Sequence, residues 1–325
     1  MFQKDYTYAV ARIRCRELSL FSNAMMEQLI SCKSYDEALH FLADKGWGGS
    51  EDYSDAEALL AAEKKKTWEL IGEMVEDMSV FDVMRITDDF HNLKAAIKLI
   101  YTNSKLPPER LFLNGGRLDA GALLRHVRAK EFGHLPGRMA TAGQEAYDVL
   151  TQTGDGQLCD IILDRAALED ILAAGKDSGN EVLWEYALLS VVAADIKIAV
   201  RSGQTGKSLD FVRRALAPCP ALNTDALAHA AVAGPEAVVE YLAQSEFSEA
   251  AGALQESPAA FERWCDNLII RHLQTQKSNP FTVGPLAAFI LARENEIKCV
   301  RMVLSGKLNN LPESTIRERM REMYV

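Results

Sequence analysis

The triplet Asp195-Ile196-Lys197 lies near the end of a long apolar stretch, and two related triplets lie at nearly equal distances from it. Asn92-Leu93-Lys94 begins 103 residues earlier, and Glu296-Ile297-Lys298 begins 101 residues later. Each triplet sits in sequence of helical period, and about ten residues beyond it comes another lysine where a helix would end. This even spacing predicts a threefold internal repeat.

The chain outside the triplets is also typical of helices. Segment 8–29 carries apolar residues at helical spacing and predicts one amphipathic helix. Ser34, with Glu37 three residues later, forms a capping box that predicts the start of the next helix, and the glycines from Gly46 to Gly49 predict its end. Alternating runs of Val, Ile and Thr, which would indicate strands, do not occur. The sequence therefore predicts an all-α fold.

Two breaks divide the helical sequence at the spacing of the triplets. The pair Pro107-Pro108 cannot continue a helix, and a second break lies near 202–207. We therefore expect three similar helical domains. Their expected bounds are 1–112, 113–208 and 209–325.

Composition limits the class of protein. Of 325 residues, 48% are hydrophobic and 25% charged, which is the profile of a folded globular protein. The net charge of −10 is opposite in sign to the field that attracts a phosphate backbone, so nucleic acid is not an expected partner. The longest apolar runs, 186–194 and 283–292, are about half the roughly twenty residues of a membrane helix, and we expect no transmembrane segment.

The six cysteines are scattered and have no metal-ligand spacing. They are Cys15, Cys32, Cys159, Cys219, Cys265 and Cys299. We expect all six to be buried thiols in a reducing compartment.

No motif predicts catalysis or a cofactor. The loop 203–208 resembles a phosphate-binding loop, but that motif needs glycine where Arg201 stands, and the loop follows a helix rather than a strand. We expect a helix C-cap there, with Gly206 left-handed. The histidines are isolated. Glu294 and Glu296 point in different directions on a helix, and we expect them to be solvated or paired with Arg293, Lys298 and Arg301. The sequence thus predicts no catalytic, cofactor-binding or metal-binding residue.

Three basic pairs lie at or just after the triplets and are the candidate partner-binding residues. Within each pair the two residues are three or four apart, so they share one face of a helix. The pairs are Lys94 with Lys98, Lys197 with Arg201, and Lys298 with Arg301. They are either solvated or neutralised by acids on a neighbouring helix. Alternatively, if a pseudo-threefold axis relates the repeats, they form a ring of positive charge that would attract an acidic or polar partner.

Several segments along the chain are similar to one family. They are Tyr6 to Glu17, Asp89 to Lys94, Asp195 to Lys197 with Arg201, Leu291 to Pro312, and Ile316 to Tyr324. In this order they resemble the C subunit of the prokaryotic V-type (A-type) ATPases, a homologue of the d subunit of the eukaryotic V-ATPase, over residues 6–325. The chain departs from the family at Arg293, where lysine is usual, and matches only loosely over 113–169.

The resemblance implies an all-helical funnel of three similar domains with pseudo-threefold symmetry and no active site. Such a subunit sits on the membrane rotor ring of proteolipid subunits and receives the foot of the central shaft, which is built from D-type and F-type subunits. It would be a non-catalytic central-stalk subunit that transmits torque for ion transport. It would lie peripherally at the cytoplasmic face of the membrane and need no cofactor.

A free-standing helical scaffold that binds peptides or proteins is the alternative. Its usual repeats of about 34 to 47 residues are much shorter than the period of about 102 in this chain. A helical hydrolase would need clustered carboxylates or histidines, which the sequence lacks. The long period favours the rotary ATPase subunit.

Overall fold

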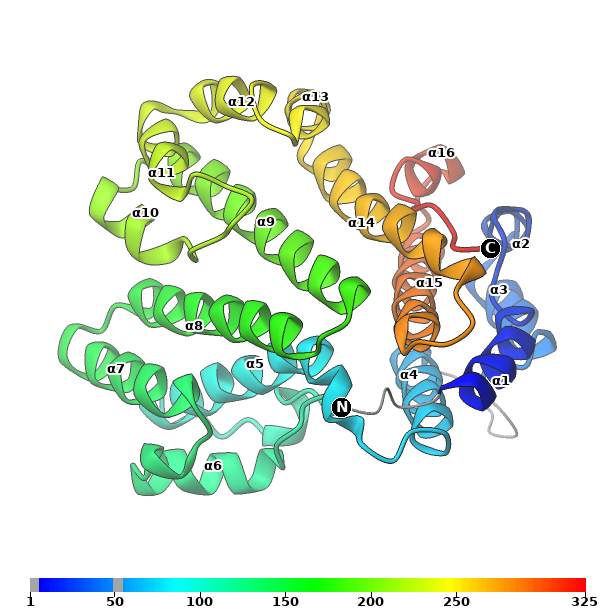
Figure 1. The fold of residues 1–325 in the computed structure, drawn as a ribbon, viewed down its shortest axis with the longest axis horizontal. Coiled ribbons are helices and arrows are strands. Elements are labelled where there is room, and N and C mark those ends of the chain that lie inside the picture. The colour runs from blue at the N-terminus through cyan, green and yellow to red at the C-terminus, as the bar shows by residue number, and fades with distance from the viewer. Residues whose placement is uncertain (1–5, 49–54) are drawn as a thin grey trace. The chain divides into compact units, whose positions relative to one another are not determined.

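The structure, a computed structural model, describes residues 6–48 and 55–325. All regular structure in these ranges is helical, which confirms the all-α prediction (Figure 1). The helices belong to two compact units, each built from separate stretches of chain. Unit 1 consists of Met1–Met78, Asn180–Val182 and Glu249–Val325, and unit 2 of Ser79–Gly179 and Leu183–Ser248. The three domain bounds expected from the repeat remain a prediction.

Unit 1 is organised around one long helix. Its elements are α1 (Thr7–Glu17), α2 (Asn23–Ile30), α3 (Tyr35–Asp44), α4 (Ala56–Gly72), most of α13 (Ser248–Glu256), α14 (Pro258–Gln274), η4 (Thr275–Ser278), α15 (Gly284–Leu308) and α16 (Glu313–Arg317). Helix α15 packs against α1 to α4, α14 and α16. Because neighbours surround it, α15 is buried along most of its length and on more than one face.

Unit 2 is a set of helices layered along the chain. Its elements are η1 (Met78–Phe81), α5 (Asp82–Tyr101), η2 (Pro108–Arg110), α6 (Ala120–Ala129), η3 (Phe132–His134), α7 (Arg138–Thr153), α8 (Gly156–Asp177), α9 (Glu181–Gln204), α10 (Leu209–Ala215), α11 (Thr224–Ala233) and α12 (Pro235–Ala243). The first residue of η1 and the first two of α9 are grouped with unit 1. Helix α8 packs against α5, α7 and α10.

The helix predicted over 8–29 is in fact two helices, α1 and α2. Ser22 begins the second one, because its Oγ accepts a hydrogen bond from the backbone N–H of Met25 at 3.3 Å. Buried Phe21 lies in the break, and its ring centroid is 5.6 Å from that of Trp47. Burial of Phe21 and the Ser22 cap compensate for the interrupted helix, while the apolar pattern continues across it.

Helix α3 begins where the capping box predicted. The Oγ of Ser34 accepts from the N–H of Glu37 at 3.1 Å, and the Glu37 carboxylate accepts from the N–H of Lys33 at 2.8 Å. After α3, Gly46 adopts a left-handed φ of 83° that ends the helix. Gly49, the last residue of the predicted glycine stop, lies outside the described residues.

The core of unit 1 lies between its first helices and α15. Leu29, Leu42 and Leu60 come from α2, α3 and α4, and they belong to the same buried cluster as Cys299 and Val303 of α15. The folded state of unit 1 therefore requires segments separated by more than 200 residues to come together.

Two glycines allow α9 to approach its neighbours in unit 2 closely. A Cβ on Gly175 of α8 would overlap the Cβ of Ala187, and a Cβ on Gly203 of α9 would lie 2.8 Å from the carbonyl oxygen of Ala231. A larger residue at either position would force the backbones apart.

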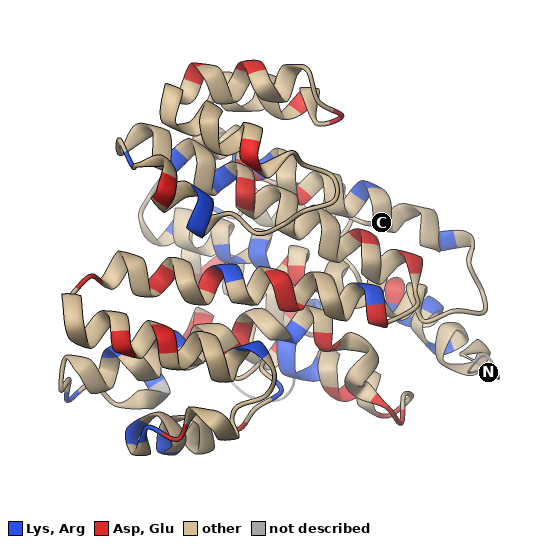
Figure 2. Ribbon diagram, turned by 60° about the vertical axis from the view of Figure 1, so that its left-hand side comes forward, with Lys and Arg blue, Asp and Glu red and all other residues tan. Residues whose placement is uncertain are grey.

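Charge is mixed along the surface of the helices. In Figure 2, Lys and Arg positions are interspersed with Asp and Glu positions along the helices. Among the described residues, no helix is both long enough and apolar enough to span a bilayer.

Candidate partner-binding site

The three triplets occupy equivalent positions on three long helices, α5, α9 and α15. The first residue of each triplet is a buried polar residue, the second is a buried aliphatic one, and the third is a lysine at the surface. The polar residues Asn92, Asp195 and Glu296 are 1%, 0% and 2% exposed. Their aliphatic neighbours are 0%, 0% and 6% exposed. The sequence repeat therefore corresponds to a repeated pattern of burial.

Each buried polar side chain binds the backbone of a distant segment. Asn92 accepts from the N–H of Leu113 at 2.7 Å and donates to its carbonyl at 2.8 Å. Asp195 Oδ1 accepts from the N–H of Ala217 at 3.0 Å. In the third triplet the Glu296 carboxyl group faces the backbone of Phe21, in the break between α1 and α2, and this contact acts to lower its pKa. These contacts satisfy backbone groups that burial would otherwise leave without a partner.

Burial changes the acidity of the two carboxyl groups. Removal from water raises the pKa of Asp195 to about 7, although the Ala217 N–H and the Arg165 guanidinium act in the opposite direction. Burial likewise raises the pKa of Glu296 to about 7, against the lowering effect of Arg293. One oxygen of each carboxyl group, Oδ2 of Asp195 and Oε2 of Glu296, is buried without a hydrogen-bond partner within the described part of the chain.

The two glutamates of the third triplet region differ in environment. Glu294 is partly exposed and lies 3.9 Å from Lys64 of α4, which is not among the basic residues expected as its partners. Glu296 is buried and paired with Arg293 at 2.8 Å, and that guanidinium is itself only 8% exposed. The expectation of pairing is met for Glu296, but the alternative of a solvated side chain is wrong. Position 296 faces the core of unit 1, because α15 has neighbours on several sides.

The three triplet helices also end alike. Two positions beyond the last residue of each helix comes a residue with left-handed φ: Asn103 (47°), Gly206 (63°) and Asn310 (52°). The next backbone N–H bonds back to the carbonyl five residues earlier, in the pairs Ser104 to Leu99, Lys207 to Ser202, and Leu311 to Gly306. This is the Schellman pattern, and it confirms the predicted C-cap at Gly206.

The loop 203–208 is thus a helix end in the structure and not a phosphate-binding loop. It follows α9, and Lys207 donates from Nζ to Gln157 Oε1 at 2.5 Å. Its ammonium also lies 4.9 Å from the centroid of the Phe211 ring. Lys207 is therefore committed to contacts within unit 2.

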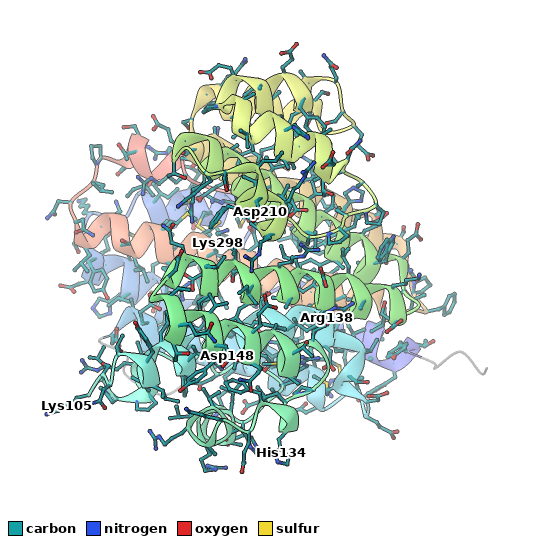
Figure 3. All side chains as sticks on the ribbon, turned by 90° about the vertical axis from the view of Figure 1, so that its left-hand side faces the viewer. Lys105, His134, Arg138, Asp148, Asp210 and Lys298 are labelled. Carbon is teal, nitrogen blue, oxygen red and sulfur yellow. The ribbon has the colours of Figure 1, made fainter. Side chains whose placement is uncertain are left out.

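The six candidate basic residues fall into two groups. Four of them are paired with carboxylates of the same unit. The distances are 2.5 Å for Lys94–Asp164, 2.6 Å for Lys98–Asp160, 2.5 Å for Lys298–Asp266 and 2.9 Å for Arg301–Glu57. Figure 3 labels Lys298. These pairs match the alternative in which acids on a neighbouring helix neutralise the basic residues.

Lys197 and Arg201 form the second group. Both are exposed on α9. Across residues 6–48 and 55–325, no hydrogen bond or ion pair joins either side chain to another residue. Their positions, four residues apart on one helix face, place two uncompensated positive charges side by side. Of the six, these two are available to an external partner without first breaking an ion pair.

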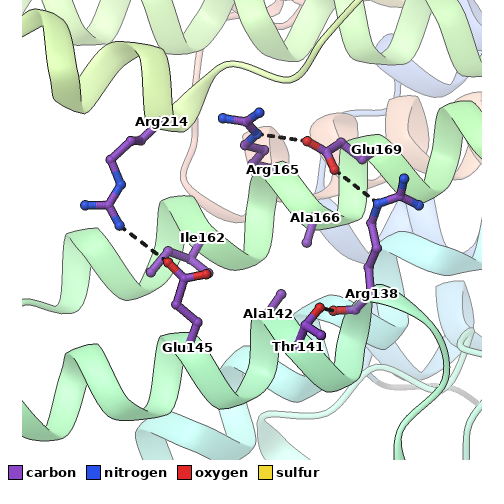
Figure 4. Close-up of a pocket in the computed structure, with 9 residues that line it drawn as sticks. All are labelled: Arg138, Thr141, Ala142, Glu145, Ile162, Arg165, Ala166, Glu169 and Arg214. Carbon is purple, nitrogen blue, oxygen red and sulfur yellow. Dashed lines mark hydrogen bonds and ion pairs between the residues drawn. The ribbon is translucent and has the colours of Figure 1, made fainter.

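A pocket of about 330 Å³ lies between α7, α8 and α10 of unit 2 (Figure 4). It is lined by Arg138, Thr141, Ala142, Glu145, Ile162, Arg165, Ala166, Glu169 and Arg214. Glu169 bridges Arg138 and Arg165 at 3.1 and 2.9 Å, and Glu145 lies 3.5 Å from Arg214. Arg138 also pairs with Asp170 at 2.9 Å, so three carboxylates offset the three guanidiniums and the pocket offers little attraction to an anion.

Cysteine and histidine positions bear on other kinds of site. Five cysteines are buried, but Cys15 is exposed on α1, which corrects the expectation that all six are buried. Position 15 falls on the outward face of α1, because Ala9, Val10 and Ile13 form its buried stripe. His126 and His134 stack with ring centroids 5.2 Å apart. No group of three potential metal ligands occurs among the described residues.

Sequence reasoning missed the buried polar residues themselves. A signal for Asp195 was present, because Val191, Val192 and Ala199 lie three or four residues away and place position 195 on the core face of α9. A polar residue on a core face requires a buried partner. That partner, the N–H of Ala217, follows only from the tertiary structure.

Comparison with known proteins identifies the family of this chain. Residues 9–319 match the ATP synthase (C/AC39) subunit family. The chain is 24% identical to the C subunit of the V-type sodium ATPase of Enterococcus hirae, over 96% of this chain and 97% of the relative. It is 24% identical to the C subunit of the A-type ATP synthase of Methanocaldococcus jannaschii, over 96% and 85% of the two chains. It is 22% identical to the C subunit of the V-type ATP synthase of Thermus thermophilus, over 97% and 98%. The chain belongs to the ATP synthase (C/AC39) subunit family, whose members are structural rather than catalytic subunits of rotary V-type and A-type ATPases.

Proposed function

We propose that this chain is the central-stalk subunit that links the rotor shaft of a rotary V-type or A-type ATPase to its membrane proteolipid ring and transmits torque for ion transport. The match to these ATPase relatives over nearly the whole chain carries the proposal. In this role the protein binds D-type and F-type shaft subunits on one side and the ring on the other. It lies at the cytoplasmic face of the membrane as a peripheral subunit.

The contacts within each unit support a role in transmitting force. A subunit that carries torque must resist deformation, and each triplet helix contacts a distant backbone segment through a buried polar side chain, Asn92, Asp195 or Glu296. Buried polar contacts of this kind have strict geometry and make one arrangement of the helices preferred. The close packing of α9 at Gly175 and Gly203 adds to this rigidity.

We further propose that the three repeats, 1–112, 113–208 and 209–325, form a funnel with pseudo-threefold symmetry. The shared burial pattern of the triplets and the shared Schellman ends of α5, α9 and α15 support this arrangement. An experimental structure of the assembled complex would test it. Three triplets unrelated by rotation about a common axis would contradict it.

Binding to purified partners tests the main proposal. The purified chain should bind a complex of D-type and F-type shaft subunits from the same organism, and it should also sediment with the detergent-solubilised proteolipid ring. A peptide-binding scaffold would bind neither. Absence of binding to both, with the chain folded by circular dichroism, would contradict the proposed role.

Charge reversal at Lys197 and Arg201 tests the partner-binding residues. We expect the double variant Lys197→Glu/Arg201→Glu to bind the shaft about tenfold more weakly at low salt, mainly through slower association, and the deficit to shrink as salt is raised. Because neither side chain contributes an ion pair to the fold, the thermal midpoint should stay within a few degrees of that of the unmodified chain.

The matched control is Arg125→Glu/Arg128→Glu on α6. These two arginines are also exposed, three residues apart on a helix, and their reversal changes the net charge by the same amount. Equal loss of binding in both double variants would show that overall charge, and not the face of α9, governs docking. Unchanged binding in the α9 variant would place the shaft contact elsewhere.

A further inference from the structure

Asp195 occupies the position that Asn92 occupies in the first triplet, but its hydrogen bonds are incomplete. The amide of Asn92 uses one atom to accept from the Leu113 N–H and the other to donate to the Leu113 carbonyl. Asp195 accepts from the Ala217 N–H with Oδ1, while Oδ2 is buried without a partner within the described part of the chain. The side chain is fully buried. An ionised carboxylate would place negative charge on the buried Oδ2, which has no hydrogen bond to stabilise it among the described residues.

We propose that Asp195 is a neutral carboxylic acid in the folded protein under mildly acidic conditions, and that it closes a proton-dependent clasp between α9 and the segment 216–223, which loosens when the acid ionises. The clasp joins α9 to the connection between α10 and α11. It is a property of the chain itself and does not depend on the proposed partners.

The surroundings of Asp195 do not supply a compensating charge in direct contact. From α8, the Arg165 guanidinium acts on it from a distance but bonds to Glu169 at 2.9 Å. From the segment 216–223, the Ala217 N–H donates to it, and the Cys219 thiol is a neutral neighbour whose pKa is raised by burial. From α12, Tyr241 lies near Cys219 and bonds to the backbone at 223. No charged group within the described residues makes a hydrogen bond with Asp195, so burial outweighs these influences.

The direction of the pH dependence follows from the raised pKa. Burial raises the pKa of Asp195 to about 7, from a value near 4 in the unfolded chain. The folded state therefore binds a proton that the unfolded state has already released. The stabilisation is fully present below the unfolded pKa and is lost as pH rises through the folded pKa. The loss runs from about pH 4 to about pH 7 and levels off above that, so the interval from pH 6 to pH 8 contains about its last tenfold change.

Hydrogen exchange of the segment 216–223 in the full chain tests the clasp. After correction for the intrinsic exchange rate, local opening should increase about tenfold between pH 6 and pH 8 in the unmodified chain. In Asp195→Asn it should be nearly constant, because the amide keeps the acceptor for Ala217 and carries no proton that titrates. The variant should also be better protected than the unmodified chain at pH 8.

The reciprocal variant is Asn92→Asp in α5. It should introduce the same pH dependence at the segment around Leu113 and leave 216–223 unchanged. If this variant does not fold, the comparison of Asp195→Asn with the unmodified chain still decides the question. The same pH dependence in both of those proteins would mean that a group other than Asp195 titrates, and weaker protection of Asp195→Asn at every pH would mean that the ionised carboxylate is the favoured form. Either result would overturn the proposal.

Discussion

Replacement of Arg293 by methionine should destabilise unit 1, and the loss should be larger at pH 8 than at pH 6. The Arg293 guanidinium donates to Glu296 at 2.8 Å and to the Ser19 hydroxyl at 3.0 Å. It also lies 5.9 Å from the ring centroids of Trp47 and Phe289. Methionine retains most of the apolar stem that packs between these rings, so the change chiefly removes the charge and its hydrogen bonds.

The size of this loss of stability depends on whether Glu296 is ionised or protonated once Arg293 is absent. A buried carboxylate without its partner would cost about 3–5 kcal/mol. Glu296 can avoid this cost by taking up a proton, because burial already raises its pKa to about 7 and removal of Arg293 raises it further. At pH 6 we therefore expect a loss of about 2 kcal/mol, attributable to the missing hydrogen bonds.

The pH dependence gives the sharper prediction. A folded-state pKa above the unfolded value means that stability falls as pH rises through the folded value. Between pH 6 and pH 8, Glu296 in the variant should cost up to about 3 kcal/mol, at about 1.36 kcal/mol for each pH unit. The unmodified chain should lose about half as much from this group, because its Glu296 is already ionised above pH 7. The difference between the two proteins should thus grow by about 1–2 kcal/mol over this interval.

Urea unfolding at pH 6 and pH 8, followed by circular dichroism and tryptophan fluorescence, measures this difference. The contribution of Asp195 is common to both proteins and cancels. In a matched double variant, Arg293→Met/Glu296→Gln, no carboxyl group remains to titrate, so its loss relative to the unmodified chain should shrink by about 1–2 kcal/mol between pH 6 and pH 8 instead of growing. A loss below about 1 kcal/mol, or one that is equal at both pH values, would refute the reasoning that Arg293 keeps a buried Glu296 ionised.

Two further predictions concern packing and ion pairing. Gly203→Ala should destabilise the protein by about 1–2 kcal/mol in thermal unfolding, because the new Cβ would press on the carbonyl oxygen of Ala231. Gly252→Ala on α13, which has open space around it, should be neutral or should stabilise the protein by up to about 1 kcal/mol. Asp266→Asn should cost about 1.5–3 kcal/mol in thermal unfolding, because the buried Arg321 loses the carboxylate that lies 2.8 Å from it. Asp160→Asn removes a partly exposed ion pair with Lys98 and should cost under about 1 kcal/mol by the same measurement.

Local signals in the sequence predicted the class of fold and several helix ends. The Ser34 capping box and the Gly206 C-cap are both present, because each depends on residues only a few positions apart. The break before α2 was not predicted, although Ser22 is a good N-cap residue. The apolar pattern runs through the break, and the reason for the break is the burial of Phe21 against α3 and its neighbours, which is a tertiary effect.

The candidate site could be predicted only as a set of equivalent positions. The repeat identifies three basic pairs, and nothing in their local sequence distinguishes one from another. The structure separates them by residues far along the chain, since Lys94 meets Asp164 across 70 positions. Lys197 and Arg201 meet no such acid among the residues that the structure describes. Ion pairs between helices are set by tertiary packing, which a single sequence does not encode locally.

The contact between Glu296 and the backbone of Phe21 has a consequence for folding during synthesis. The first two triplets bind segments that leave the ribosome about 20 residues after them, so α5 and α9 can complete their contacts soon after translation. The third contacts a segment that is made some 275 residues earlier. Asn23 likewise accepts a hydrogen bond from the backbone N–H of Met323, which is made 300 residues later. Unit 2 is therefore able to fold first, while the apolar faces of α1 to α4 stay uncovered until α15 emerges. Such a delay exposes the nascent chain to aggregation, and we expect chaperones to bind its early helices for most of the time that translation takes.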